Sequence, residues 1–236
     1  MLAPQRLALS GPTLVRLLAR FGDAEVPESR QSISDHLSQW LGWTDAIALS
    51  TALSVQTPDG EPTTRVGASI EQSQSERVRA ALRKAIAGEG APARRDGRRT
   101  QAASQPADVE PDFADFRQRY LALQQAMETD IATLRARLRA ALAARAPALA
   151  RLATVDAVME QALGARERSL LAGVPALLGA HFERQRAAAA AQSAAESAAR
   201  NAWLAGFRKD MQSVLLAELE IRFQPVEGLL AALRTR

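Results

Sequence analysis

One apolar stripe constrains the fold of this chain more than any other feature. Its nine large side chains recur at spacings of three and four residues, 29 residues in eight steps. The mean step of about 3.6 residues is the period of a straight α-helix, whereas a heptad coiled coil requires 3.5. We therefore predict one helix over residues 112–146, about 50 Å long, packed in a bundle. The stripe comprises Phe113, Phe116, Tyr120, Leu123, Met127, Ile131, Leu134, Leu138 and Leu142.

The composition favours helices throughout. The 236 residues include 50 Ala, 30 Leu and 28 Arg, which are strong helix formers. Strands favour β-branched and aromatic residues, but Ile and Val total only 17 and aromatic residues 10. Because alanine supplies about half of the apolar residues, we expect a thin core. The predicted fold is all-α: short N-terminal helices, a flexible linker and then an elongated bundle of long helices.

The N-terminal part contains three short helical patterns. The first covers residues 14–21. The second covers residues 32–54, where we expect Gly42 to end one helix and Thr44 to cap the next, with Trp40 and Trp43 flanking the glycine. The two tryptophans are either core anchors of a helical corner or an exposed hot spot for a partner, where tryptophan is enriched. The third pattern predicts a helix from about residue 69 to 87, ended by Gly88.

Residues 88–111 predict a linker, since they contain Gly, Pro, Ser, Gln and charge, with Val109 as the one large apolar residue. We therefore divide the chain into an N-terminal helical region (1–87), a flexible linker (88–111) and a C-terminal long-helix bundle (112–236).

Glycines and prolines set the expected helix ends in the C-terminal region. Pro147 should end or kink the first long helix. Gly164 is a candidate end for the second helix, and Pro175 and Gly179 should weaken the third. A later helix carrying Trp203 should end at Pro225, followed by a short helix over residues 226–233.

The sequence shows no constellation for catalysis or for a bound cofactor. There is no cysteine, and the two histidines, His36 and His181, are far apart without zinc-site spacing. Phosphate-binding glycine loops and nucleophile motifs are missing. We expect no enzyme activity, no metal and no cofactor. No apolar stretch reaches the roughly 20 residues of a membrane span, and no secretory signal is evident, so we expect a cytoplasmic protein.

Arginine forms the largest field of a single charge sign. No acidic residue lies between Asp130 and Asp156, a stretch that includes Arg135, Arg137, Arg139 and Arg145. These side chains form either a solvated helix face or a binding face for an acidic partner such as nucleic-acid phosphates. Aromatic side chains, which would support nucleic-acid recognition, are not interleaved among them. Residues 169–182, flanked by arginines, offer a third possibility, contact with a membrane surface.

Two blocks resemble a bacterial family of uncharacterised proteins, domain of unknown function 3348. They are SQWLGWTDAIALSTAL (Ser38–Leu53) and NAWLAGFRKDMQSVLLAELEIRFQPVEGLL (Asn201–Leu230). The resemblance covers most of the chain and carries no assigned catalytic residues. It implies an association with genes for envelope proteins that contain OmpA-like domains.

These observations predict a non-enzymatic helical interaction or scaffold protein, with the resemblance pointing to a cytoplasmic accessory of an envelope complex. We expect self-association or a protein partner. The candidate partner-binding residues are Trp40, Trp43, Arg135, Arg137, Arg139 and Arg145. The alternative is a nucleic-acid-binding, nucleoid-associated helical protein that uses the arginine-rich face.

Overall fold

The structure is a computed structural model that describes residues 13–22, 32–54, 66–88, 112–192 and 197–235. The described residues form α-helices and no strand, which confirms the predicted all-α fold. The helices are α1 (Thr13–Gly22), α2 (Ile33–Trp40), α3 (Trp43–Ser54), α4 (Val66–Ala87), α5 (Phe113–Arg145), α6 (Pro147–Leu171), α7 (Val174–Gln192) and α8 (Ser197–Arg234).

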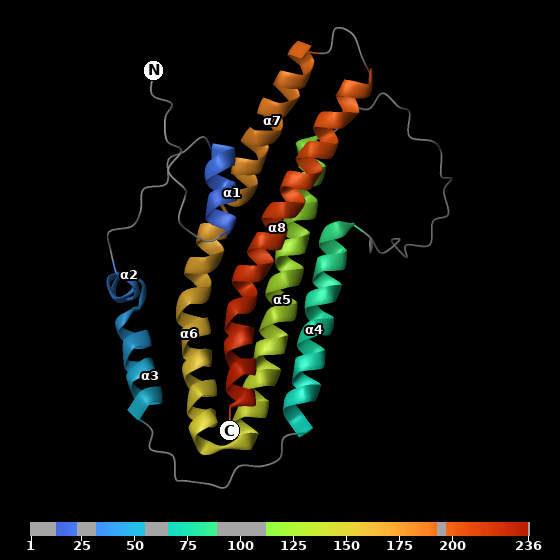
Figure 1. Ribbon diagram of the computed structural model, residues 1–236. Helices are drawn as coiled ribbons and strands as arrows, with labels where there is room; N and C mark the ends of the chain where they lie inside the picture. The colour runs from blue at the N-terminus through green and yellow to red at the C-terminus, as the bar shows by residue number, and fades with distance from the viewer. Residues whose placement is uncertain (1–12, 23–31, 55–65, 89–111, 193–196, 236) are drawn as a thin grey trace, which may run out of the picture.

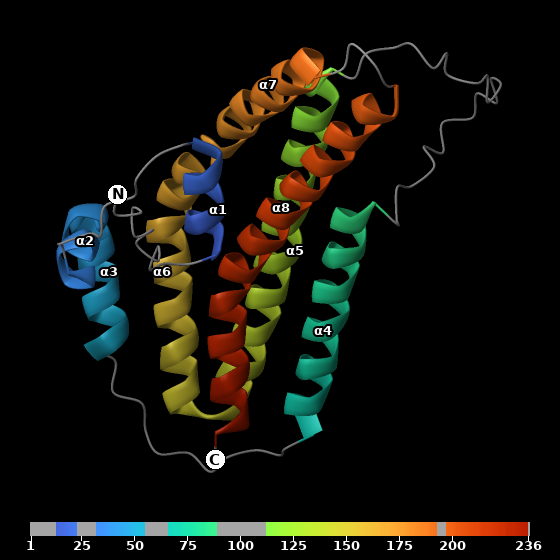
Figure 2. The same ribbon diagram turned by 45° about the horizontal axis from the view of Figure 1, so that its top comes forward.

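Long helices lie side by side in an elongated bundle (Figure 1). Helices α5 and α8 run in the same direction at the centre, and α4 runs in the opposite direction against both. Helix α6 returns along α5, and α7 continues past it against α1, α5 and α8 (Figure 2). Helices α2 and α3 meet at a corner and pack on α6, on the side of the bundle away from α4.

The apolar stripe of α5 is the centre of the core, as predicted. Six of its nine members are buried, and Phe113, Phe116 and Leu123 pack against the core while partly exposed. The helix begins after Asp112, whose carboxylate accepts a hydrogen bond from the Ala114 amide at 3.0 Å. It ends at Arg145, because Ala146 is extended and Pro147 starts α6.

The N-terminal helices contact the C-terminal bundle. Helix α4 packs on α5 and α8, α1 packs on α7 and α8, and α2 and α3 pack on α6. Gly88, with φ of 84°, follows the end of α4 as expected. The rest of the predicted linker, residues 89–111, lies outside the described residues.

Two N-terminal helix starts differ from the sequence expectation. Helix α4 begins at Val66 rather than near residue 69. Helix α3 begins at Trp43, so Thr44 is not its cap; the Asp45 carboxylate instead accepts a hydrogen bond from the Gly42 amide at 3.1 Å. This contact satisfies a backbone donor that would otherwise lack a helical partner.

The expected helix end at Gly164 is wrong. Helix α6 continues through this glycine to Leu171, and the break falls at Ala172–Gly173. A helical glycine costs only about 1 kcal/mol relative to alanine, so packing along α6 overrides it. Pro175 lies in the first turn of α7, where a missing amide hydrogen costs no helical bond. Gly179 lets the Phe113 ring approach, since a Cβ there would lie 2.9 Å from the ring.

The expected end at Pro225 is also wrong, because α8 continues through it to Arg234. Proline cannot donate to the carbonyl of residue 221, which normally destabilises a helix interior. The residues that follow compensate through burial on one face. They are Val226, Leu229, Leu230 and Leu233.

We predict that Leu138→Ala lowers the free energy of unfolding by about 3 kcal/mol, because the side chain is fully buried and truncation leaves a cavity. Urea denaturation followed by circular dichroism measures the change. Leu121→Ala, on an exposed position of the same helix, is the matched control and should cost less than about 1 kcal/mol. Equal losses in the two variants would contradict the placement of the stripe.

Candidate interaction surface

The corner between α2 and α3 holds two of the three tryptophans. A reciprocal cap starts α2: the Ser32 hydroxyl accepts from the Asp35 amide at 3.1 Å, and the Asp35 carboxylate accepts from the Ser32 amide at 3.0 Å. These hydrogen bonds lower the pKa of Asp35. Leu41 has an extended backbone that ends α2, and α3 starts after Gly42, at Trp43.

The two tryptophans have different surroundings. Trp40 stacks on the His36 ring at 5.2 Å between centroids, and the Arg166 guanidinium lies 5.7 Å from its ring, so α6 contributes to its packing. Trp43 keeps 82% of its surface exposed. The sequence left open whether these residues are core anchors or exposed contacts, and Trp43 has the exposure that a contact residue requires.

Trp43 belongs to an exposed face of α3 that carries no charge. Ile47 is 51% exposed, and Ser50 and Ser54 follow on the same side at helical spacing. Ala46 and Leu53 border them, and both are exposed. Asp45 is the one charged residue of α3, and it caps the helix. We call these six residues the α3 face: Trp43, Ala46, Ile47, Ser50, Leu53 and Ser54.

The arginines of α5 are paired with carboxylates of neighbouring helices. Arg135 and Arg139 both bind Asp156, at 2.7 and 2.9 Å, and both bind Glu160, at 3.2 and 2.6 Å. All four side chains are largely buried between α5 and α6. The apparent field of positive charge is therefore neutralised from α6, which the sequence of α5 alone could not reveal.

The other two candidate arginines join α5 to α4 and α8. Arg137 forms a bidentate pair with Glu71 of α4, with N–O distances of 2.7 and 3.0 Å. Arg145 donates to the backbone carbonyl of Leu233 near the end of α8. Each of the four arginines thus has a partner on another helix, so these side chains connect α5 to its neighbours and do not form an open cationic surface.

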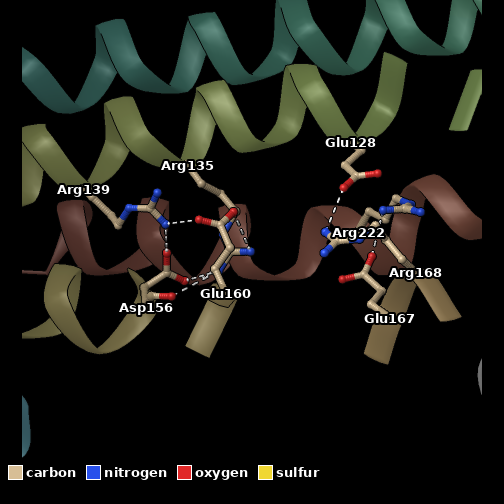
Figure 3. A network of polar contacts seen from close by, with 8 residues as sticks. All are labelled: Glu128, Arg135, Arg139, Asp156, Glu160, Glu167, Arg168 and Arg222. Atoms are coloured by element: carbon tan, nitrogen blue, oxygen red, sulfur yellow. Dashed lines mark hydrogen bonds and ion pairs between the residues drawn. The ribbon is translucent and has the colours of Figure 1, made fainter. Parts of the chain in front are cut away.

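A groove between α5 and α6, with α8 along its floor, lies between two groups of ion pairs (Figure 3). The Arg135–Glu160 pairs lie at one end. At the other end Arg168 binds Glu128 at 3.0 Å and Arg222 binds Glu167 at 2.8 Å. Every charged side chain that lines the groove is paired within the chain, so none of them is an uncommitted charge for a ligand.

A second polar network crosses the core between α5 and α8. The Glu218 carboxylate is fully buried and accepts hydrogen bonds from the Tyr120 hydroxyl at 2.6 Å and from Gln124 at 3.1 Å. Arg222, one turn later on α8, donates to it at 3.0 Å. Sequence analysis missed this network, although Tyr120 gave a signal, since a buried tyrosine hydroxyl usually has a partner.

Comparison with known proteins places the chain in a family. The family described as protein of unknown function (DUF3348) matches residues 1–235. The chain belongs to this family. No curated protein and no solved structure matches it.

The DUF3348 match covers both the α2–α3 corner and the long helices, so it confirms the resemblance noted in the sequence. The family description assigns no activity or ligand. Within the described residues, no group of three or more His, Asp or Glu side chains could hold a metal ion. None of the helices in the same ranges is long and apolar enough to cross a membrane.

We predict that the Tyr120 site makes stability fall at high pH. Burial, together with the charge and hydrogen bond of Glu218, raises the pKa of Tyr120 far above its ordinary value. Above about pH 10 an unfolded tyrosine has lost its proton while the folded one keeps it, so the free energy of unfolding decreases as pH rises. Tyr120 is the single tyrosine of the chain, so tyrosinate absorbance reports this site alone.

In an alkaline titration, tyrosinate should appear only together with the loss of helical circular dichroism. Tyr120→Phe retains the ring and removes the hydroxyl, and we expect this variant to show a weaker fall in stability above about pH 10. Tyrosinate that forms while the helices remain intact would contradict the buried contact with Glu218.

Proposed function

We propose that this chain is a non-enzymatic helical interaction protein, in which the long bundle is a scaffold and the α3 face is the binding surface. The observation that carries the proposal is the 82% exposure of Trp43 within an uncharged helix face. Tryptophan is among the residues that contribute most at protein interfaces, and contiguous exposed apolar surface marks interaction sites.

The scaffold gives this surface a fixed position. Helix α3 packs along α6, with Ala52 buried on the side opposite Trp43. Helix α6 is in turn clamped to α5 by the Arg135 and Arg139 ion pairs. A binding surface held this way loses little conformational entropy on association, which favours affinity.

Nucleic-acid binding by the α5 arginines has weaker support than it had from the sequence. A phosphate ligand would have to displace carboxylates from Arg135, Arg137 and Arg139, which already hold short, charge-assisted contacts. We therefore retain protein contact as the proposal. A cytoplasmic location at an envelope complex is the finer part of the proposal, and it rests on the family resemblance alone.

The test is affinity purification of the tagged full chain from its own host, with nuclease treatment and identification by mass spectrometry. We predict that Trp43→Ser/Ile47→Ser loses specific partners that the wild type retains. Ile70→Ser on α4 is the matched control, since the exposed fraction of Ile70, 53%, is similar to the 51% of Ile47. Partners that persist in the double variant would contradict the α3 face as the binding surface. Partners that vanish with nuclease would favour nucleic-acid binding.

A further inference from the structure

Four exposed residues of α3 form one row, and within this row the side chains divide by size along the helix. Trp43 and Ile47 are large and lie in the N-terminal half, whereas Ser50 and Ser54 are small and lie in the C-terminal half. The four are spaced by four, three and four residues, so they form one row on one side of the helix. The row therefore has a raised half and a low half.

This order of sizes is complementary to itself in one orientation. If a second α3 packs antiparallel across the same row, Trp43 of one copy lies opposite Ser54 of the other, and Ile47 lies opposite Ser50. Each large side chain then meets a small one at every position. Parallel pairing would instead oppose Trp43 with Trp43 and leave a gap at the serines.

The absence of charge on this face agrees with a symmetric contact. A two-fold interface places the same patch of both copies together, so a patch with charges of a single sign meets the same sign on its partner. The α3 face contains no charged side chain, whereas the exposed surfaces of α4 and α8 carry Arg83, Glu220 and Glu227. Self-pairing through the α3 face thus involves no electrostatic repulsion or desolvation of charge.

We propose that the α3 face binds a second copy of this chain through antiparallel, two-fold packing of α3 on α3. The proposal rests on the proposed function, in that it takes the α3 face as the binding surface and specifies the partner. Helix α3 is about 18 Å long and about 10 Å wide, which offers far less than the roughly 800 Å² per partner of a standard interface. The dimer is therefore weak and depends on concentration.

The first experiment is sedimentation of the purified full chain over a range of concentrations. We expect a reversible monomer–dimer equilibrium with a dissociation constant between about 10 µM and about 1 mM. Ser50→Glu, which puts a charge into the contact, should raise that constant more than about tenfold. Thr44→Glu is the matched control. It adds the same charge at an exposed position of α3, about a third of a turn around the helix from Ser50, and should change the constant less than about twofold.

The second experiment tests orientation by disulfide formation, since the chain has no cysteine of its own. Ile47→Cys and Ser50→Cys chains are mixed, oxidised mildly and analysed by intact mass. Antiparallel pairing predicts that the mixed 47–50 disulfide exceeds the two homodisulfides combined, since random pairing of equal amounts would make these two quantities equal. A parallel arrangement predicts the homodisulfides and would overturn the proposed orientation.

The outcomes separate this inference from the proposed function. A chain that stays monomeric at all concentrations overturns self-pairing, whether another protein or another part of the same chain covers the face. If that monomer still loses an identified partner through Trp43→Ser/Ile47→Ser, the proposed function stands. If it loses none, both fail. Circular dichroism melting of every variant checks that the bundle is intact.

Discussion

The packing of the α5 stripe is the interaction on which the rest of the bundle depends. Helix α5 contacts α4, α6, α7 and α8, and its buried row from Tyr120 to Leu142 runs along most of its length. Most helical stability in proteins comes from burying an apolar face, so α5 depends on the helices that cover this row. The neighbouring helices therefore depend on the same row for their own burial.

Ion pairs between charged side chains join the helices outside their thin apolar core. Alanine is abundant along these helices and buries little area, so the helix flanks are joined by long side chains instead. Arg135 and Arg139 each reach two carboxylates of α6, and Arg137 reaches Glu71 of α4. Arginine suits this role, because its planar guanidinium binds a carboxylate in two places and stays charged when partly buried. Because Arg135, Arg139 and Asp156 are largely removed from water, loss of one partner would leave another charge uncompensated inside the protein.

The sequence predicted helices where a single period dominates and failed where packing overrides a local signal. The α5 stripe and the end at Pro147 were predictable, because both follow from one segment alone. The sequence predicts helix ends at Gly164 and Pro225, but each lies inside a helix whose flanking residues pack against other helices. Proline in a helix interior costs about 3 kcal/mol or more, and burial of Val226 and the leucines beyond it offsets that cost. The cost of glycine is smaller, about 1 kcal/mol.

The candidate site shows the same division. The exposure of Trp43 was one of two alternatives left by the sequence, and no pattern in residues 32–54 distinguishes the buried side of α3 from its open side, because the helix is apolar on both. The arginine partners could not be predicted at all, since Asp156, Glu160 and Glu71 lie on other helices and meet α5 only in the folded chain. A run of one charge sign in a sequence is therefore weak evidence for a ligand until its neighbours in space are known.

The two kinds of apolar surface in this protein have different energetic consequences. Leu138 is removed from water when the chain folds, so its burial contributes to the folding free energy. Trp43 remains mostly in water in the folded chain and gains little from folding, so the gain from burying its ring is still available to association. Because α3 is short and its contacts with the bundle lie on the opposite side, association through Trp43 requires no rearrangement of the core. The fold thus separates the residues that hold the scaffold together from the surface proposed for binding, and each can be altered without the other.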